Sequence, residues 1–139
     1  MLKFVPFDEI DSTHIRAIAE SMTVCPEFHR PLADDVMADL KAGRAKLFAF
    51  EDGLMILSVE QHNVSGERRL LIDAWSGDGS IFRRAEAASD LRRIAADWQC
   101  DVIETLVFDL RLASAICSIG GHVESICVTL PVSLAERVN

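Results

Sequence analysis

The sequence lacks any apolar run long enough to cross a membrane. Its apolar runs are short, as in residues 54–57, whereas a transmembrane helix needs about 20 such residues. The first seven residues carry one lysine and no extended apolar stretch, so we expect no signal peptide and no membrane span. These absences predict a protein that stays in the cytoplasm.

Basic residues are also scarce. The chain has 14 Lys and Arg against 22 Asp and Glu, which gives a net charge of −8 at pH 7. Nucleic-acid binding relies on clustered Lys and Arg, so we expect no nucleic-acid partner. The acidic residues are scattered, with Asp34–Asp35 as the densest pair. Imitation of DNA would need longer carboxylate runs, so the charge favours solubility instead.

Closely spaced cysteine pairs are absent from the sequence. The four cysteines lie at positions 25, 100, 117 and 127, and the histidines at 14, 29, 62 and 122. None forms a Cys-x-x-Cys pair and the histidines lack ligand spacing, so the sequence predicts no metal site. We expect reduced thiols, most of them buried.

No repeat, linker or low-complexity segment divides the 139 residues. We therefore expect one domain over residues 1–133 and a polar tail at 134–139. Hydrophobic periodicity and turn residues predict the elements in between. In chain order they are a strand at 2–6, a helix from Asp11–Ser12 to before Pro26, a helix between Pro31 and Gly43, strands at 46–50, 54–61 and 69–75, a helix from Ser80 or Ile81 to Trp98, a strand at 102–108, a helix at 112–119 and a strand at 123–130. Asp52–Gly53 is interpreted as the turn of a tight hairpin.

The longest expected helix carries one apolar stripe along its length. Its arginines, at 83, 84, 92 and 93, fall mostly elsewhere on the helix surface. The residues that we expect to be buried against the sheet are Phe82, Ala85, Leu91, Ile94 and Trp98.

This order of elements resembles that of the GNAT superfamily of N-acetyltransferases over nearly the whole chain. The resemblance implies an α+β fold with a mixed, mostly antiparallel sheet of about six strands and helices on both faces. In that family a loop before the long helix cradles the pyrophosphate of acetyl-CoA, because free N–H groups and the helix dipole favour anionic oxygens there. The cofactor-binding residues implied here are Trp75, Ser76, Gly77, Asp78, Gly79, Ser80, Arg83 and Arg84.

A second stretch, residues 109–122, is similar to the family's short helix and closing glycine step. Ala113 matches the small helix residue and Gly121 the glycine, while His122 replaces an aromatic residue. A wider pattern looks especially like the divergent GNAT-like proteins of tailed bacteriophages and prophages: Trp75, Gly77, Gly79, Ala95, Cys100, Arg111, Gly120 and Gly121. This subtype implies a place in the host cytoplasm or the virion, with other virion proteins as partners.

The chain departs from the family pattern at two functional positions. The family's general acid is usually a tyrosine on the short helix, and this chain contains no tyrosine. Cys117 stands near that spacing and is either a proton donor or a buried apolar residue. Asp78 lies where a basic or glycine residue is usual, and its charge opposes pyrophosphate binding. Arg83 and Arg84 could offset it.

A general base for the substrate amine would come from the central strands. Asp73 and Glu60 can serve if they point into a cleft, and are otherwise exposed positions of alternating strands. His122 is interpreted as a surface residue at the start of a strand.

Three functions stay open. The missing tyrosine, the acidic loop and the phage-type pattern favour a non-catalytic structural or interaction protein, acting in virion assembly or genome ejection. The retained glycine loop and long helix support an active acetyl-CoA-dependent N-acetyltransferase that acts on a small or protein amine. An acidic inhibitor of host defence rests on charge and size alone. The sequence thus favours a degenerate acetyl-CoA site over a working enzyme.

We expect the protein to bind acetyl-CoA no more tightly than about 100 μM, or about −5 to −6 kcal/mol. The glycine loop and arginines attract the anionic ligand, whereas Asp78 and the net charge of −8 oppose it. Calorimetry at low salt, where screening is weakest, measures this affinity, and Asp78→Arg should strengthen it. Micromolar binding by the unmodified protein, with steady CoA release in the presence of amines, would contradict the non-catalytic interpretation.

Overall fold

A five-stranded sheet in the order β1-β2-β3-β4-β5 forms the centre of the fold. The computed structural model describes residues 2–21, 33–77, 81, 84–105 and 110–123. Neighbouring strands are antiparallel from β1 to β4, and β5 pairs with β4 in parallel. The strands are β1 (Lys3–Val5), β2 (Ala45–Phe50), β3 (Gly53–Gln61), β4 (Arg68–Trp75) and β5 (Val102–Thr105).

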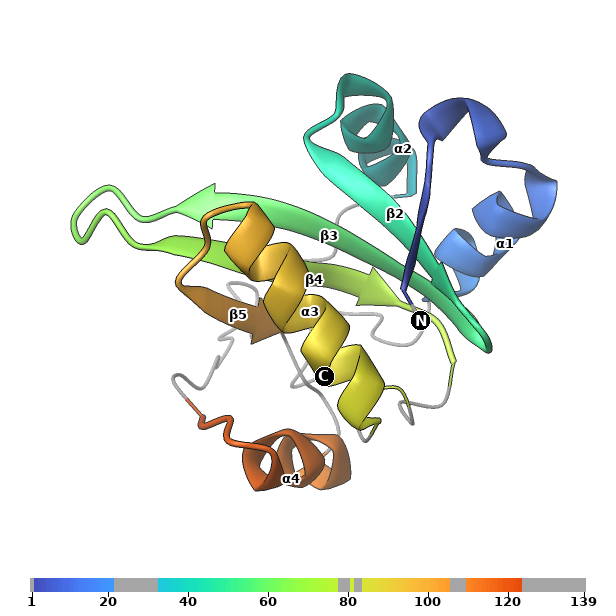
Figure 1. Ribbon diagram of the computed structural model, residues 1–139. Helices are drawn as coiled ribbons and strands as arrows, with labels where there is room; N and C mark the ends of the chain where they lie inside the picture. The colour runs from blue at the N-terminus through green and yellow to red at the C-terminus, as the bar shows by residue number, and fades with distance from the viewer. Residues whose placement is uncertain (1, 22–32, 78–80, 82–83, 106–109, 124–139) are drawn as a thin grey trace, which may run out of the picture.

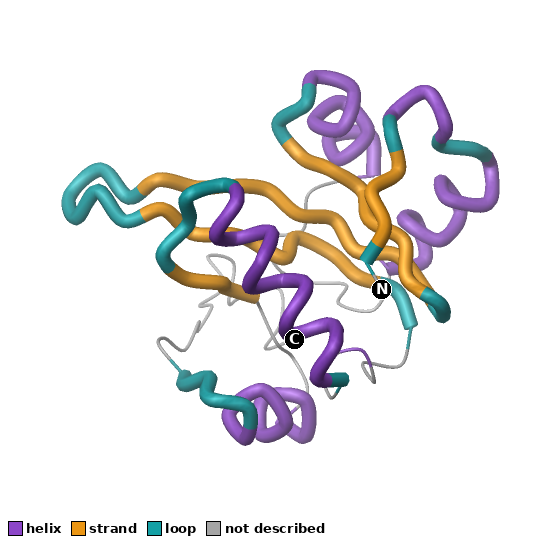
Figure 2. Tube along the Cα trace, viewed as in Figure 1, coloured by secondary structure: helices purple, strands orange, loops and turns teal. Residues whose placement is uncertain are grey.

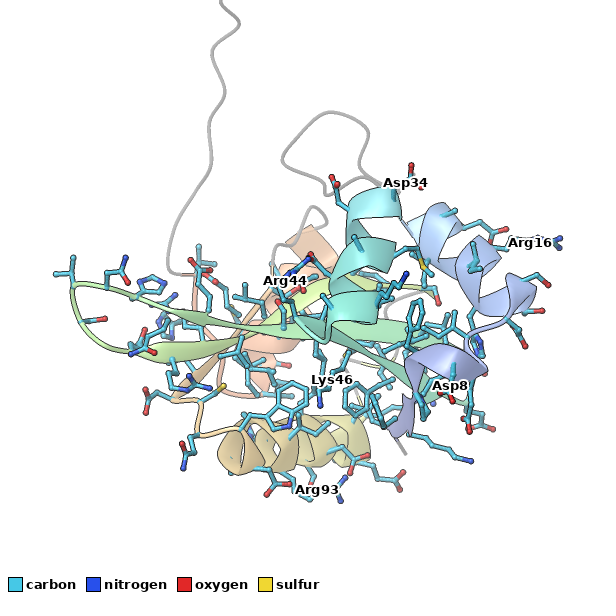
Figure 3. The ribbon with its side chains drawn as sticks, turned by 90° about the horizontal axis from the view of Figure 1, so that it is seen from above. Asp8, Arg16, Asp34, Arg44, Lys46 and Arg93 are labelled. Carbon is cyan, nitrogen blue, oxygen red and sulfur yellow. The ribbon has the colours of Figure 1, made fainter. Side chains whose placement is uncertain are left out.

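Helices cover both faces of this sheet. They are the short 3-10 helix η1 (Phe7–Glu9), α1 (Ser12–Ser21), α2 (Ala33–Ala42), α3 (Ala85–Asp97) and α4 (Leu110–Ser118). Figure 1 shows α3 crossing one face, and the view from above in Figure 3 places α1 and α2 on the other. The α+β class and the mostly antiparallel sheet are therefore confirmed. Most of the strand expected at 123–130 lies outside the described residues. No helix in the described part of the chain is long and apolar enough to span a membrane.

The sheet separates two apolar cores. On the α3 face, Met55, Leu57 and Leu70 are fully buried, and they belong to one cluster with Leu91 and Ile94 of α3. On the α1/α2 face, a second cluster consists of Ile18, Val36, Leu40, Ala45, Leu47, Leu54 and Ile56. Consecutive residues 54–57 alternate between the two cores, so this central strand is apolar on both faces.

The tube in Figure 2 shows where the helical part of α3 lies along the sheet. It begins at Ala85, so the expected start at Ser80 or Ile81 was wrong; Ser80 itself lies outside the described residues. Ile81 is buried ahead of the helix. Arg84 is the N-cap of α3, and its backbone is extended, with φ −89° and ψ 121°. The Arg84 side chain bonds to Asp52, a contact distant in sequence that no local pattern reveals.

The buried stripe of α3 differs in part from the expected one. Leu91 and Ile94 are buried as predicted, and Trp98, directly after the helix, packs against the same core. Ala85 is exposed, contrary to expectation, because the helix starts there and Ala87 faces the sheet instead. Phe82 lies outside the described residues. Figure 3 shows Arg93 pointing away from the sheet, as the stripe requires.

A lysine links the first strand to the end of α3. The Lys46 ammonium lies 5.5 Å from the centre of the Phe4 ring and 5.6 Å from that of Trp98. Figure 3 shows this side chain between β2 and α3. Cation–π attraction of this kind holds the edge strand β1 against the helix that covers the sheet.

The packing of Leu91, which is only 6% exposed, yields a stability test. Leu91→Ala should lower the free energy of unfolding by about 2–4 kcal/mol, because it leaves a cavity under α3. Ser89→Ala, at an exposed position of the same helix, should change it by less than about 0.5 kcal/mol. Urea denaturation measures both. Equal effects would show that this face of α3 is not packed as described.

Candidate functional site

An irregularity in β4 places one side chain out of the alternating pattern. Ile56 pairs with Ala74, whereas the next residue, Leu57, pairs with Ile72. Asp73 is therefore an extra residue in β4, opposite no residue of β3. Such β-bulges re-aim a side chain and are frequent beside active sites. Asp73, one of two sequence-predicted bases, stands at this bulge.

Asp73 combines access to solvent with partial desolvation. Its side chain is exposed, yet enough protein atoms surround the carboxyl group that desolvation raises its pKa. A hydrogen bond from Ser58 acts in the opposite direction, and the nearby charges of Asp39 and Glu60 raise the pKa further. A carboxyl group with a raised pKa holds a proton more readily than an ordinary one, which suits proton transfer near neutral pH.

The raised pKa also makes folding stability depend on pH. Because the folded state binds this proton more tightly than the unfolded state, Asp73 favours folding at low pH. That contribution is lost as the pH rises from the ordinary aspartate value through the higher folded value. Above that window the ionised Asp73 lowers stability relative to a fully solvated aspartate.

Glu60, the other predicted base, lies on β3 and is exposed. It lies opposite Arg69 in the ladder between β3 and β4, and its negative charge raises the pKa of Asp73. Asp39 of α2 also acts on Asp73, although its carboxylate is held 2.8 Å from the Arg44 guanidinium. The two sequence-predicted carboxylates therefore lie on neighbouring strands, and the charge of Glu60 contributes to the raised pKa of Asp73.

The described pairs between β4 and β5 run from Arg69 with Val102 to Ile72 with Thr105, and residues 106–109 lie outside the described residues.

The start of the predicted cofactor loop is fixed to the β2–β3 hairpin. The Leu54 N–H donates to Ser76 Oγ at 2.8 Å, and the Ser76 N–H donates to the Leu54 carbonyl at 2.9 Å. A Cβ on Gly53 would stand 2.5 Å from the Ser76 carbonyl oxygen. The hairpin turn consists of Glu51 and Asp52, because Phe50 pairs with Gly53. Its expected position was thus wrong by one residue: Gly53 allows close approach to Ser76.

Gly77 continues this segment with a left-handed φ of +110°, which favours glycine. Among the described residues, a Cβ there would meet the Asp52 carbonyl oxygen at 3.6 Å. The neighbouring Trp75 packs against the α3-face core. Three more of the predicted cofactor-binding residues, Asp78, Gly79 and Ser80, lie outside the described residues.

Acidic side chains surround the start of α3. The Arg84 guanidinium lies 2.6 Å from the Asp52 carboxylate and 3.9 Å from that of Glu51. Glu86 stands in the first helical turn. Arg84 therefore does not face the loop as a free cation, and Arg83 lies outside the described residues. These carboxylates were missed by sequence reasoning, although the neighbouring pair Glu51–Asp52 in a hairpin turn was a readable signal.

A shallow recess opens beside the bulge on the α1/α2 face. It lies between α1 and the ends of β3 and β4 and encloses no space for a water-sized molecule. The lining residues are Ala17, Ile18, Leu54, Ile56, Ala74, Trp75 and Ser76. Small-molecule sites typically enclose roughly 300–1,000 Å³. This recess is therefore too shallow to enclose a ligand.

The remaining candidates lie at the surface. Cys117 of α4 is exposed, so its interpretation as a buried apolar residue was wrong. His122 is exposed, as expected. Within the described ranges, no group of three or more His, Cys, Asp or Glu residues is placed to hold a metal ion. Ser58 was also missed, because a serine in a strand carries no signal of its partner.

The contact between Gly53 and Ser76 predicts a sharp effect of one methyl group. Gly53→Ala should lower the free energy of unfolding by about 1–3 kcal/mol, because the new Cβ meets a backbone oxygen that cannot rotate away. Adding Ser76→Ala should not restore stability, since that backbone oxygen stays. Thermal and urea denaturation measure both variants, and an unchanged Gly53→Ala protein would show that the two segments are not in contact.

Comparison with solved structures finds acetyltransferases. A probable acetyltransferase superposes with a TM-score of 0.68 at 13% identity, covering 96% of this chain and 98% of its own. An aminoglycoside acetyltransferase from an uncultured soil metagenomic sample gives 0.65 at 15% identity, covering 96% and 98%. An acetyltransferase from Trypanosoma brucei gives 0.59 at 15% identity, covering 95% and 99%.

No protein-family model matches the sequence, and no curated protein matches it either. Structural likeness at this level of identity bears on the fold. Together with the sheet order and the helices on both faces, it shows that this chain has the GNAT-like fold of the acetyltransferases.

Proposed function

We propose that the protein is an acetyl-CoA-dependent N-acetyltransferase in which Asp73 is the general base. The observation that carries this proposal is the position of Asp73, at a bulge in β4 where it bonds to Ser58 and where desolvation raises its pKa. The sequence favoured a non-catalytic protein because of the missing tyrosine, the acidic loop and the phage-type pattern. The bulge and the partial desolvation of Asp73 instead support a catalytic role for one of the two bases that the sequence offered.

Parts of the predicted cofactor site fit an anionic cofactor. Gly77 has a left-handed backbone and precedes the start of the longest described helix, and among the described residues a Cβ on it would contact the Asp52 carbonyl oxygen at 3.6 Å. Backbone in this conformation can aim N–H groups at phosphate oxygens. Ser76, Gly77 and Arg84 would hold the cofactor, with Asp52 and Glu86 opposing it. Bound acetyl-CoA would supply a thioester whose C–S bond breaks as the amine forms the new C–N bond.

Asp73 accepts the proton that the amine loses. Its carboxylate keeps solvent access, which allows direct transfer or transfer through one water molecule. Ser58 donates a hydrogen bond that orients the carboxylate, while Glu60 and Asp39 favour its protonated form. The same negative charges attract a cationic amine, so a small or protein amine fits as acceptor.

Return of a proton to the departing thiolate needs a second group. With no tyrosine in the chain, we assign this role to the exposed thiol of Cys117 or to solvent. Cys117→Ser keeps a group of similar size that is a much weaker acid, and Cys117→Ala removes the donor. A rate that falls for both variants supports the thiol, and an unchanged rate supports solvent.

A second candidate is the non-catalytic structural or interaction protein of phage type, with other virion proteins as partners. It is favoured by the missing tyrosine and by Glu51, Asp52 and Glu86 around the start of α3. These charges weaken the attraction of a helix N-terminus for an anion. Under this candidate, amines cause no release of CoA, whichever carboxylate is replaced.

The two candidates separate in a pH profile of kcat/KM with acetyl-CoA and a panel of amines. Asp73→Asn should lower kcat/KM by roughly 100- to 10,000-fold, the usual contribution of a general base. For the unmodified protein the acid limb should lie above the ordinary aspartate pKa, because desolvation raises the pKa of Asp73. Glu60→Gln should move that limb to lower pH with kcat retained, since it removes a like charge.

Thermal denaturation provides the control for folding. Asp73→Asn should melt no lower than the unmodified protein at neutral pH, because it removes a charge that opposes folding. Full activity of folded Asp73→Asn would contradict the assignment of the base. Absence of amine-dependent CoA release from every folded form would favour the phage-type candidate.

A further inference from the structure

The β2–β3 turn holds both ends of the segment from Ser76 to Arg84. At one end, the backbone and side chain of Ser76 bond to Leu54, directly after the turn. At the other end, the Asp52 carboxylate accepts a hydrogen bond from Arg84 at 2.6 Å. One short hairpin thus fixes where the predicted cofactor loop starts and where α3 begins.

An anionic ligand can displace the Asp52 carboxylate from Arg84. The Arg84 side chain is 31% exposed and that of Asp52 58% exposed, so solvent reaches both partners. Glu51 lies farther from the guanidinium, at 3.9 Å, and is 81% exposed. Exposed ion pairs contribute little to stability, and a phosphate is as good a partner for a guanidinium as a carboxylate.

We propose that Asp52 sets the affinity of the site for its anionic cofactor by holding Arg84 in a pair that the cofactor must displace. This inference rests on the proposed function and deepens it. Arg84 is the N-cap of α3 and therefore stands where helix N–H groups attract anionic oxygens. While its guanidinium bonds to Asp52, it is not fully available to a phosphate. Asp52 therefore affects cofactor affinity through its contact with Arg84.

A supporting role for Asp52 would change cofactor affinity in the opposite direction. If Asp52 served only to support Arg84 in a productive position, its removal would weaken cofactor binding. If it competes, its removal strengthens binding. Asp52→Asn separates these roles, because asparagine has nearly the same shape as aspartate, is equally common in turns and removes only the charge. Glu51→Gln is the matched control, since it removes the same charge from the neighbouring residue.

Calorimetry with CoA at low salt measures the effect directly. Asp52→Asn should tighten CoA binding by about fivefold, whereas Glu51→Gln should change it by less than about twofold. Arg84→Gln should have a small effect alone but should abolish the gain in the Asp52→Asn background. Inorganic pyrophosphate is a second probe, for which the same order of affinities is expected.

Each outcome bears on the proposal. Equal CoA affinity of Asp52→Asn and Glu51→Gln overturns it, and so does weaker binding by Asp52→Asn, which would identify a supporting role. A gain that survives Arg84→Gln also overturns it, because the effect would then not pass through the guanidinium. Failure of all folded variants to bind CoA or pyrophosphate overturns the proposed function itself, and melting temperatures confirm that each variant is folded.

Discussion

The extra residue in β4 is the constraint on which the rest of the candidate site depends. In a regular strand, Ile72 and Trp75 would face opposite sides of the sheet. The bulge at Asp73 lets both pack against the α3-face core, while Ala74 packs against the other core. Asp73 is thereby held at a crowded position it would not occupy in an unbroken strand. Desolvation of the carboxyl group at this position raises the pKa of Asp73.

Local patterns predicted much of the fold, because local physics determines it. The meander of β2, β3 and β4 follows from alternating apolar residues and turns, and the buried stripe of Leu91 and Ile94 follows from helical spacing. The start of α3 was missed because a contact between Arg84 and Asp52 influences it across 32 positions. Gly53 was assigned to the turn because sequence does not show that the Ser76 carbonyl fills the space of its Cβ.

The candidate site was predictable in its residue types and not in their environment. Asp73 and Glu60 could be named from their strands, yet nothing in the sequence marks the register shift that distinguishes them. The same limit applies to charge. A count of −8 describes the whole chain, whereas binding of an anion depends on the few carboxylates near the start of α3. Whether this fold performs catalysis or serves as a scaffold depends on that local balance.

The parallel pairing of β4 with β5 has a consequence for the order of folding. Antiparallel neighbours joined by short turns close quickly, whereas β5 must wait until the chain has crossed the sheet through α3. The edge strand β1 likewise meets β2 only after two intervening helices. We therefore expect the meander, which already contains the bulge, to form before β1 and β5 join it. Amide hydrogen exchange would follow this order if β1 and β5 also opened first, and Asp73 would then lie on the most persistent of the described strands.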